Sequence, residues 1–297
     1  MTGQIVVGID GSASASAAVE WAADAAGCSG AALKIVHVRE PWAMTAPVVR
    51  SQGIEESLAG YAESLLAAAA GRARERAPGV TVTSARVTGA VAERLRTEAE
   101  RAEALVIGSR GTGGFAGLVL GSVALSLAGH AVCPVVVVRA PARTVHGVIV
   151  VGFDDSGCSQ AAVEYAFVQA RLRRCRLRAL HAWRMPLLAP YALGYAPEQE
   201  LEGLFREEAE ATRRHLAAWR EKYPDVEVEE SVVHGHPIPV LSDASREADL
   251  VVVGSHGRSG FGAVLLGSVG HGVLHRAHCP VAVVGPQTRP AGESRPQ

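Results

Sequence analysis

The chain has 297 residues, of which 48% are hydrophobic and 20% are charged, and its formal net charge is −1 with histidines neutral. This length predicts about two domains, each with a sizeable core. The near-zero charge argues against a general binder of nucleic acids or anionic membranes, because both kinds of binder need an excess of basic residues.

Apolar runs and amphipathic stretches alternate along the first half of the chain. Short runs rich in Val and Ile predict buried strands, and longer stretches with apolar residues at helical spacing predict helices. The predicted strands cover 4–9, 33–38, 80–87, 104–109 and 134–138, and the predicted helices cover 14–27, 53–76, 91–102 and 123–131. Short strands alternating with helices indicate a parallel, doubly wound sheet.

The second half repeats the first in the same order. VGIDGS at 7–12 is matched by VGFDDS at 151–156, and HAVCPVVVVR at 130–139 is matched by RAHCPVAVVG at 276–285. We therefore predict two tandem, doubly wound (Rossmann-like) α/β domains with five-stranded parallel sheets, at residues 1–140 and 147–285.

The last strand of each half, within 134–138 and 280–284, is apolar and would aggregate if its edge were bare. We expect these two edges to meet, so that the halves form an intramolecular pseudo-dimer. Two such chains could also form a homodimer, and no sequence feature decides this.

Several features indicate a cytoplasmic protein without a membrane span. The five cysteines form no CxxC or zinc-ligand spacing, and the first residues lack a basic and apolar signal segment. The uncharged stretch from Gly111 to Val138 is long enough to span a membrane, but glycines and Pro134 interrupt it. Cys133 and Cys279 each precede a proline and an apolar run, which indicates small buried residues, with a redox role as the alternative.

The stretch GSRGTGGFAGLVLGS, residues 108–122, is copied as GSHGRSGFGAVLLGS at 254–268. Gly108 ends a predicted strand, Gly111 follows in the loop, and Gly121 and Ser122 precede a predicted helix. Glycine allows close approach of a ligand and positive φ, and Ser122 is a good N-cap. Free N–H groups at a helix start attract anions, so this stretch predicts a phosphate cradle.

The charges around the two glycine segments suit an anion. No Asp or Glu occurs from 104 to 153 or from 250 to 292, whereas Arg110 and His256 lie within the segments. Buried elements that carry no charge would explain the same absence. A P-loop is excluded because GxxxxGK[ST] is missing, and the GxGxxA match at 111–116 is broken in the second copy, which disfavours a nicotinamide dinucleotide site.

The spacing Gly, two residues, Gly, nine residues, Gly-Ser resembles the ATP-binding signature of the universal stress protein family. Together with the paired openings and Cys-Pro strands, the resemblance covers nearly the whole chain as a tandem member. It implies one ATP site in each half. The implied contacts are Asp10, Val38, Gly108, Arg110, Gly111, Gly121, Ser122 and Val123 in the first half, and Asp154, Ala182, Gly254, His256, Gly257, Gly267, Ser268 and Val269 in the second.

In these sets the aspartates stand at the adenine and ribose end, Val38 and Ala182 offer backbone contacts to adenine, and the glycine segments hold ribose and phosphates. A strand-end Asp can equally be a turn former. Asp154 is followed by Asp155, a carboxylate that could repel phosphates or hold a metal ion, whereas Asp10 is followed by Gly11.

Neither glycine segment carries the carboxylate base that ATP turnover would need. The matched His37 and His181 are expected to pack rather than to catalyse. The resemblance implies a nucleotide-dependent regulator in a stress or dormancy response, with ATP and Mg²⁺ bound, little or no hydrolysis, and an unknown protein partner. A slow ATP hydrolase and a partner-binding scaffold with a vestigial site are the alternatives, and another adenine nucleotide could replace ATP.

Overall fold

A computed structural model describes residues 3–40, 52–113, 119–130, 132–139, 144–154, 156–183, 198–257 and 266–286. The side chains of 52–58, 198–202 and 204 lie outside this description.

The first half alternates strands and helices in the predicted order. Its strands are β1 (Gln4–Ile9), β2 (Ala32–Arg39), β3 (Val82–Thr88), β4 (Ala104–Gly108) and β5 (Val135–Val138). Its helices are α1 (Ala13–Ser29), α2 (Gln52–Arg76), α3 (Val91–Glu98) and α4 (Ser122–His130). Ser12 caps the start of α1, and Gly30 ends it in the left-handed conformation that glycine adopts without a Cβ penalty. Helix α3 is shorter than the predicted 91–102.

The second half has the same succession. Its strands are β6 (Val148–Gly152), β7 (Arg176–Trp183), β8 (Val228–His234), β9 (Leu250–Gly254) and β10 (Val281–Val284). Its helices are α5 (Gly157–Arg173), α7 (Glu198–Lys222), α8 (Pro237–Ala244) and α9 (Ser268–Arg276), with a short 3₁₀ helix η3 at Ser245–Glu247. No helix in the described ranges combines the length and apolar character that a membrane span requires.

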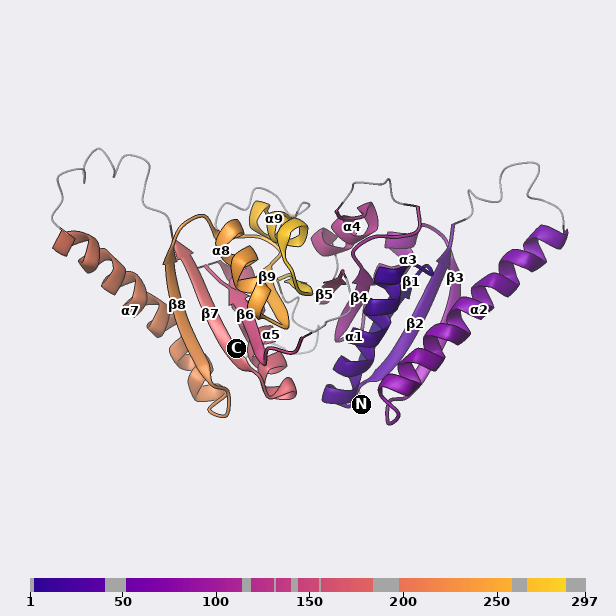
Figure 1. Ribbon diagram of the computed structural model, residues 1–297, viewed down its shortest axis with the longest axis horizontal. Coiled ribbons are helices and arrows are strands. Elements are labelled where there is room, and N and C mark those ends of the chain that lie inside the picture. The colour runs from indigo at the N-terminus through magenta and orange to yellow at the C-terminus, as the bar shows by residue number, and fades with distance from the viewer. Residues whose placement is uncertain are drawn as a thin grey trace, which may run out of the picture.

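All strands join one ten-stranded sheet in the order β3-β2-β1-β4-β5-β10-β9-β6-β7-β8, which Figure 1 shows spanning both halves. Every pairing within a half is parallel. Strand β1 lies between β2 and β4, so the connections from β1 to β2 and from β3 to β4 run to opposite sides of β1. The carboxyl ends of β1 and β4, and of β6 and β9, therefore form the topological switch points where such sheets bind ligands.

The two halves meet where their last strands pair, as the sequence predicts. Strands β5 and β10 are antiparallel, with Val136 opposite Ala282. This pairing leaves neither apolar edge bare, and it turns the halves into an intramolecular pair related by a pseudo-twofold axis. The Arg173 guanidinium lies 4.5 Å from the centre of the Trp21 ring, so α5 also contacts α1 across the boundary.

Helices cover both faces of the sheet. One buried cluster joins α1, α2, α5 and α7 to the sheet and includes Phe167 and Leu216, both fully buried. The other joins α3, α4, α8 and α9 and includes Leu127 and Leu274. Each cluster contains residues of both halves, so burial of apolar surface holds the halves together as well as each half by itself.

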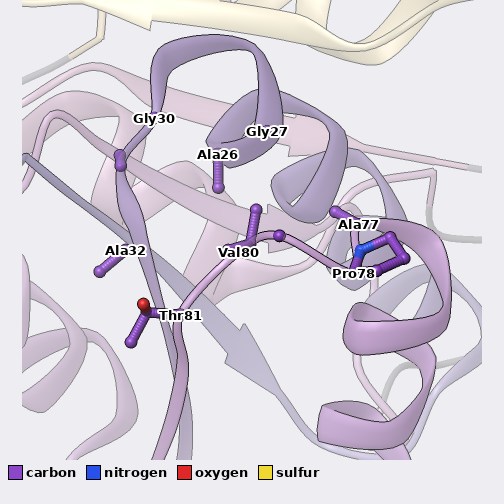
Figure 2. Close-up of a pocket in the computed structure, with 10 residues that line it drawn as sticks. Ala26, Gly27, Gly30, Ala32, Ala77, Pro78, Val80 and Thr81 are labelled. Atoms are coloured by element: carbon purple, nitrogen blue, oxygen red, sulfur yellow. The ribbon is translucent and has the colours of Figure 1, made fainter.

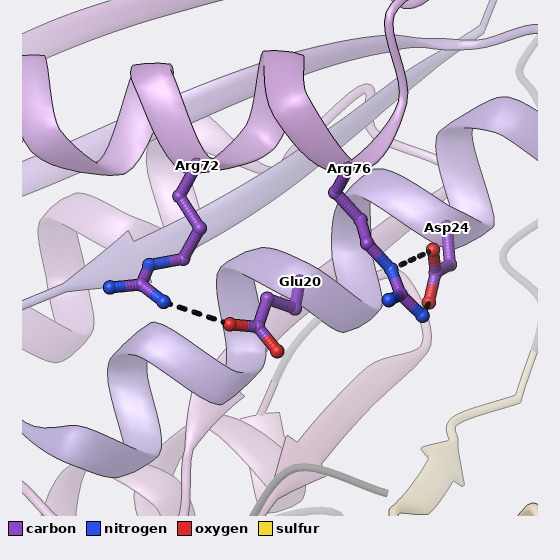
Figure 3. A network of polar contacts seen from close by, with 4 residues as sticks. All are labelled: Glu20, Asp24, Arg72 and Arg76. Carbon is purple, nitrogen blue, oxygen red and sulfur yellow. Dashed lines mark hydrogen bonds and ion pairs between the residues drawn. The ribbon is translucent and has the colours of Figure 1, made fainter.

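Helices α1 and α2 are also joined by ion pairs on their outer side (Figure 3). Arg76 donates to both carboxylate oxygens of Asp24, from Nε at 2.7 Å and from Nη2 at 2.9 Å. Arg72 Nη1 donates to Glu20 at 3.0 Å. The bidentate pair has the better geometry, because two parallel hydrogen bonds fix the guanidinium against the carboxylate.

Candidate functional site

Asp10 and the glycine loop meet at the switch point of the first half. Asp10 directly follows β1, and Gly108 ends the adjacent β4. Asp10 Oδ1 accepts a hydrogen bond from the Ser12 N–H at 3.0 Å, and Oδ2 accepts one from the Thr112 N–H at 2.7 Å. The carboxylate therefore ties the turn after β1 to the loop after β4.

Two serines that the sequence reasoning missed hold the same loop. The hydroxyls of Ser12 and Ser14 both donate to the Arg110 carbonyl, at 3.1 and 2.6 Å. In the second half Ser156 stands where Ser12 does, and its hydroxyl lies 3.5 Å from the His256 carbonyl. The shared serine in VGIDGS and VGFDDS was the signal that could have identified this contact.

Close packing explains two of the glycines. A Cβ at Gly108 would lie 2.6 Å from Ser14 Oγ, and a Cβ at Gly111 would lie 2.6 Å from Asp10 Oδ2. Neither glycine is among those with positive φ in the described chain, so the left-handed conformation that glycine permits is not used at these positions. The loop needs glycine here because the protein itself fills the space.

In the second half the corresponding aspartate also holds the turn after its strand and packs against the glycine loop, but its hydrogen-bond donors differ. Asp154 Oδ1 accepts hydrogen bonds from the Ser156 N–H at 3.0 Å and the Ser156 hydroxyl at 2.5 Å. A Cβ at Gly257 would lie 2.8 Å from Asp154 Oδ2, and one at Gly254 would lie 3.2 Å from Cys158. Asp155 lies outside the described residues, so its expected influence is not placed.

Helices α4 and α9 begin directly beside these loops. The Gly121 N–H donates to the Ser109 carbonyl at 2.8 Å, and the Gly267 N–H donates to the Ser255 carbonyl at 2.7 Å. Ser122 is the first helical residue rather than the N-cap that the sequence led us to expect, and Ser268 holds the same position in α9. The N-cap of α9 is Gly267, which has no side chain to satisfy the first helical amides.

Gly121 differs from Gly108 and Gly111. Its Cβ would lie 3.5 Å from the nearest protein atom, the Ser109 carbonyl oxygen, which is an ordinary contact. Protein packing therefore does not require glycine at the start of α4. Val123 and Val269 follow as second helical residues, so their amides belong to the first turn, whose N–H groups lack partners further back in the helix.

Val38 and Ala182 are the second-last residues of β2 and β7. These strands pair with β1 and β6, which lead to the two aspartates. His37 Nδ1 lies 3.0 Å from the Ile9 carbonyl, and His181 Nδ1 lies 3.2 Å from the Phe153 carbonyl. Because a carbonyl only accepts, each Nδ1 carries the proton. Both histidines thus brace neighbouring strands, in agreement with a packing role.

Arginine side chains lie beside the first loop, to which the Asp10 carboxylate is also bonded. Arg110 is exposed, and its guanidinium contributes, after burial, to lowering the pKa of Arg139. His256 Nδ1 lies 3.1 Å from the Ser255 hydroxyl, and His256 Nε2 is buried without a hydrogen-bond partner. In the part of the chain that the structure describes, no three His, Cys, Asp or Glu side chains gather into a metal-binding group.

A separate cavity of about 340 Å³ lies at the opposite edge of the first half, between the end of α1 and the turn that precedes β3 (Figure 2). Its lining is made of small or apolar residues such as Ala26, Pro78 and Val80. The cavity adjoins the amino ends of β2 and β3, whereas the glycine loops lie at the carboxyl ends. It is not part of the candidate site.

Comparison with known proteins places this arrangement in a family. The model of the universal stress protein family matches residues 1–139 and again 147–285. The universal stress protein Rv1996 of Mycobacterium tuberculosis is 38% identical over 308 aligned positions that cover 94% of each chain.

Two solved structures are also similar. A universal stress protein from Archaeoglobus fulgidus has 18% identity, covers 95% of this chain and 96% of its own, and superposes with a TM-score of 0.71. A universal stress protein solved in complex with cAMP has 30% identity, matches 46% of this chain and 97% of its own, and gives a TM-score of 0.38. The chain belongs to the universal stress protein family and carries the family domain twice.

Proposed function

We propose that this tandem universal stress protein binds an adenine nucleotide, ATP, at the switch point of each half and acts as a nucleotide-dependent regulator with little or no hydrolysis. One observation carries the proposal. In both halves a strand-end aspartate, a glycine loop and a helix start converge at the switch point, although they come from segments far apart in the chain.

The donor set suits a phosphate chain. Helices α4 and α9 direct their first amides and the positive end of the helix dipole at the loops, and acidic residues are absent from 104–153 and 250–292. Space without a protein contact at Gly121 is consistent with a ligand approaching the backbone there. The strand ends at Val38 and Ala182 would offer backbone groups to the base.

Mg²⁺ would accompany the phosphates rather than occupy a protein cage. The described residues gather no set of three acidic, histidine or cysteine ligands, and Mg²⁺ commonly keeps waters and phosphate oxygens in its shell. In the described part of the first site hydrolysis lacks an evident base, because both oxygens of Asp10 already accept backbone hydrogen bonds that hold the loop.

Mass analysis of the supernatant from freshly purified, denatured protein tests the proposal. We expect adenine nucleotide approaching two equivalents per chain, and binding assays with ATP, ADP, AMP and cAMP would then rank the ligands. Protein that purifies empty and binds none of the four would overturn the proposal and favour the scaffold alternative. A single-turnover assay with ATP and Mg²⁺ separates a regulator from a slow hydrolase.

Gly121→Glu is the sharpest variant. The positive end of the helix dipole stabilises an acidic residue at the start of α4, and a Cβ at this position makes only ordinary contacts with the protein. The fold should therefore persist while the carboxylate repels phosphates. Gly79→Glu is the control, since a Cβ there contacts nothing within 4 Å and the turn lies at the opposite edge. We expect one equivalent of nucleotide to be lost in the first variant and none in the control.

A further inference from the structure

Arg139 links the two halves beside the first glycine loop. It directly follows β5, and its Nη2 donates a hydrogen bond to the Leu274 carbonyl in α9 of the other half. The Ser109 N–H donates to the Val138 carbonyl at 2.7 Å, so the backbone of Arg139 adjoins the loop that carries Arg110. Two arginines from neighbouring strand ends therefore lie together at the boundary.

No acidic side chain from these elements balances the two guanidinium groups. Asp and Glu are absent from the sequence between 104 and 153 and between 250 and 292, which covers β4, β5, α4, α9 and β10. Burial first, and Arg110 second, lower the pKa of Arg139. Like charges held together in elements that carry no acidic residue are arranged to receive an anion.

A histidine from α9 joins this cationic pair. His275 follows Leu274, its ring stacks on His271 with 4.6 Å between ring centres, and its Nε2 is buried without a hydrogen-bond partner. Burial, His271 and Arg139 all lower the pKa of His275, in that order. The orphaned ring nitrogen is a polar atom for which the described protein supplies no partner.

The pseudo-twofold relation between the halves indicates where His275 lies relative to α4. In the structure a Cβ at Gly129 would lie 3.3 Å from Leu266 N, so the end of α4 packs on the segment just before α9. When the two halves are aligned by their sequence repeat, Gly129 corresponds to His275, and Leu120 corresponds to Leu266. We therefore infer that His275 approaches the residues that immediately precede Gly121, and Figure 1 shows α4 and α9 facing each other across the boundary.

The second cradle lacks counterparts of Arg139 and His275, and His256 stands where Arg110 does. The Ser255 N–H donates to the Val284 carbonyl as Ser109 does to Val138, so Gly285 stands where Arg139 stands. By the same correspondence Gly129 replaces His275, and Leu125 replaces His271. Arg258, in the second glycine segment, lies outside the described residues and corresponds to Thr112.

We propose that the phosphate end of the first nucleotide site is a composite of both halves, in which Arg110, Arg139 and His275 bind the terminal phosphate of a nucleoside polyphosphate. The second site lacks this subsite and discriminates less between nucleotides with one phosphate and with three. The inference rests on the proposed nucleotide function and adds the groups that select the length of the phosphate chain. It also makes the first site depend on the contact between the halves.

Calorimetric titration of the full-length Gly267→Glu variant, in which the second site should be blocked, tests the inference. This variant is the parent, and its dissociation constants for ATP and for AMP are compared with those of the double variant that also carries Arg139→Gln. Removing a charge-assisted contact should weaken ATP binding about tenfold while leaving AMP binding unchanged. His275→Leu should also lower the preference for ATP over AMP. This variant replaces Arg139→Gln in the test if Arg139→Gln fails to fold. Competition by inorganic phosphate in the parent separates a subsite for any phosphate from one that needs the tethered nucleotide.

Arg173→Gln is the matched control, because Arg173 also contacts the other half but lies against Trp21, away from the glycine loops. An equal fall in ATP preference for both arginine variants would mean that a purely structural link between the halves is responsible, and would overturn the inference. An unchanged ratio in Arg139→Gln and His275→Leu would overturn it as well, while leaving the proposed function intact. Absence of all nucleotide binding in the parent would remove the proposed function together with the inference.

Discussion

Asp10 and Thr112 are joined by a 2.7 Å hydrogen bond between residues 102 positions apart, in which the Thr112 N–H donates to the Asp10 carboxylate. The second carboxylate oxygen accepts the Ser12 N–H. The acid at the end of β1 therefore shapes the glycine loop before any ligand is considered. A loop that is preformed in this way loses less conformational entropy when it binds phosphates.

Asp10→Asn should weaken this connection, because an amide has one accepting oxygen where the carboxylate has two. We expect the free energy of unfolding to fall by about 1 kcal/mol, the usual net value of one hydrogen bond. Urea denaturation measures the change, and Asp225→Asn, at an exposed position, is the control. Equal stability of the two variants would argue that the Thr112 contact contributes nothing.

Gly108→Ala and Gly121→Ala separate packing from ligand access. A Cβ at Gly108 would lie 2.8 Å from Ala15 N and would displace the start of α1, which should cost about 1–3 kcal/mol of stability. A Cβ at Gly121 meets only ordinary contacts, so the cost should stay below about 1 kcal/mol. Nucleotide affinity should fall in Gly121→Ala despite its retained stability. Denaturation and nucleotide titration on the same preparations compare the two effects.

The Arg76–Asp24 pair offers a measurable surface interaction. The side chains of Arg76 and Asp24 are 55% and 38% exposed, so solvent screening limits their coupling. A double-mutant cycle should give about 0.5–1 kcal/mol for this bidentate pair. The Arg72–Glu20 pair, with one hydrogen bond, should give less. High salt should reduce both coupling energies, and an increase with salt would contradict an electrostatic origin.

His275 should make stability depend on pH. Its pKa in the folded protein is lowered from 6.5, mainly by burial, so the folded state favours the neutral ring. Its contribution is therefore complete above about pH 6.5 and is lost as pH falls through the lowered pKa, because the unfolded chain then binds the proton more readily. His275→Gln should flatten the stability profile between pH 7.5 and 5. Unfolding curves across that range provide the measurement.

Alkylation should distinguish the cysteines. Burial raises the pKa of the Cys133 thiol to about 11 and that of the Cys279 thiol to about 12. At pH 8 both thiols stay protonated, with Cys133 buried and Cys279 half-buried, whereas Cys28 is exposed. Iodoacetamide should label Cys28 first and reach Cys133 and Cys279 only after unfolding, as followed by peptide mass analysis. Rapid labelling of Cys133 in folded protein would revive the redox alternative.

The sequence by itself determined the duplication, the order of strands and helices, and the meeting of the two apolar edges. These features follow from local patterns, since alternation of short apolar runs with helical stretches reports burial along the chain. The same patterns identified the glycine segments and the strand-end aspartates Asp10 and Asp154, and through them the family.

Only the tertiary structure decided how those residues contact one another. The bonds from Ser12 and Ser14 to Arg110 and the bond from Arg139 to Leu274 join residues 96 to 135 positions apart. The packing of Gly111 on Asp10 also joins distant segments. Periodicity does not encode which strand ends become neighbours, because that depends on the order of strands in the sheet and on the pairing of β5 with β10. The asymmetry between the two cradles therefore became visible only once the halves were placed against each other.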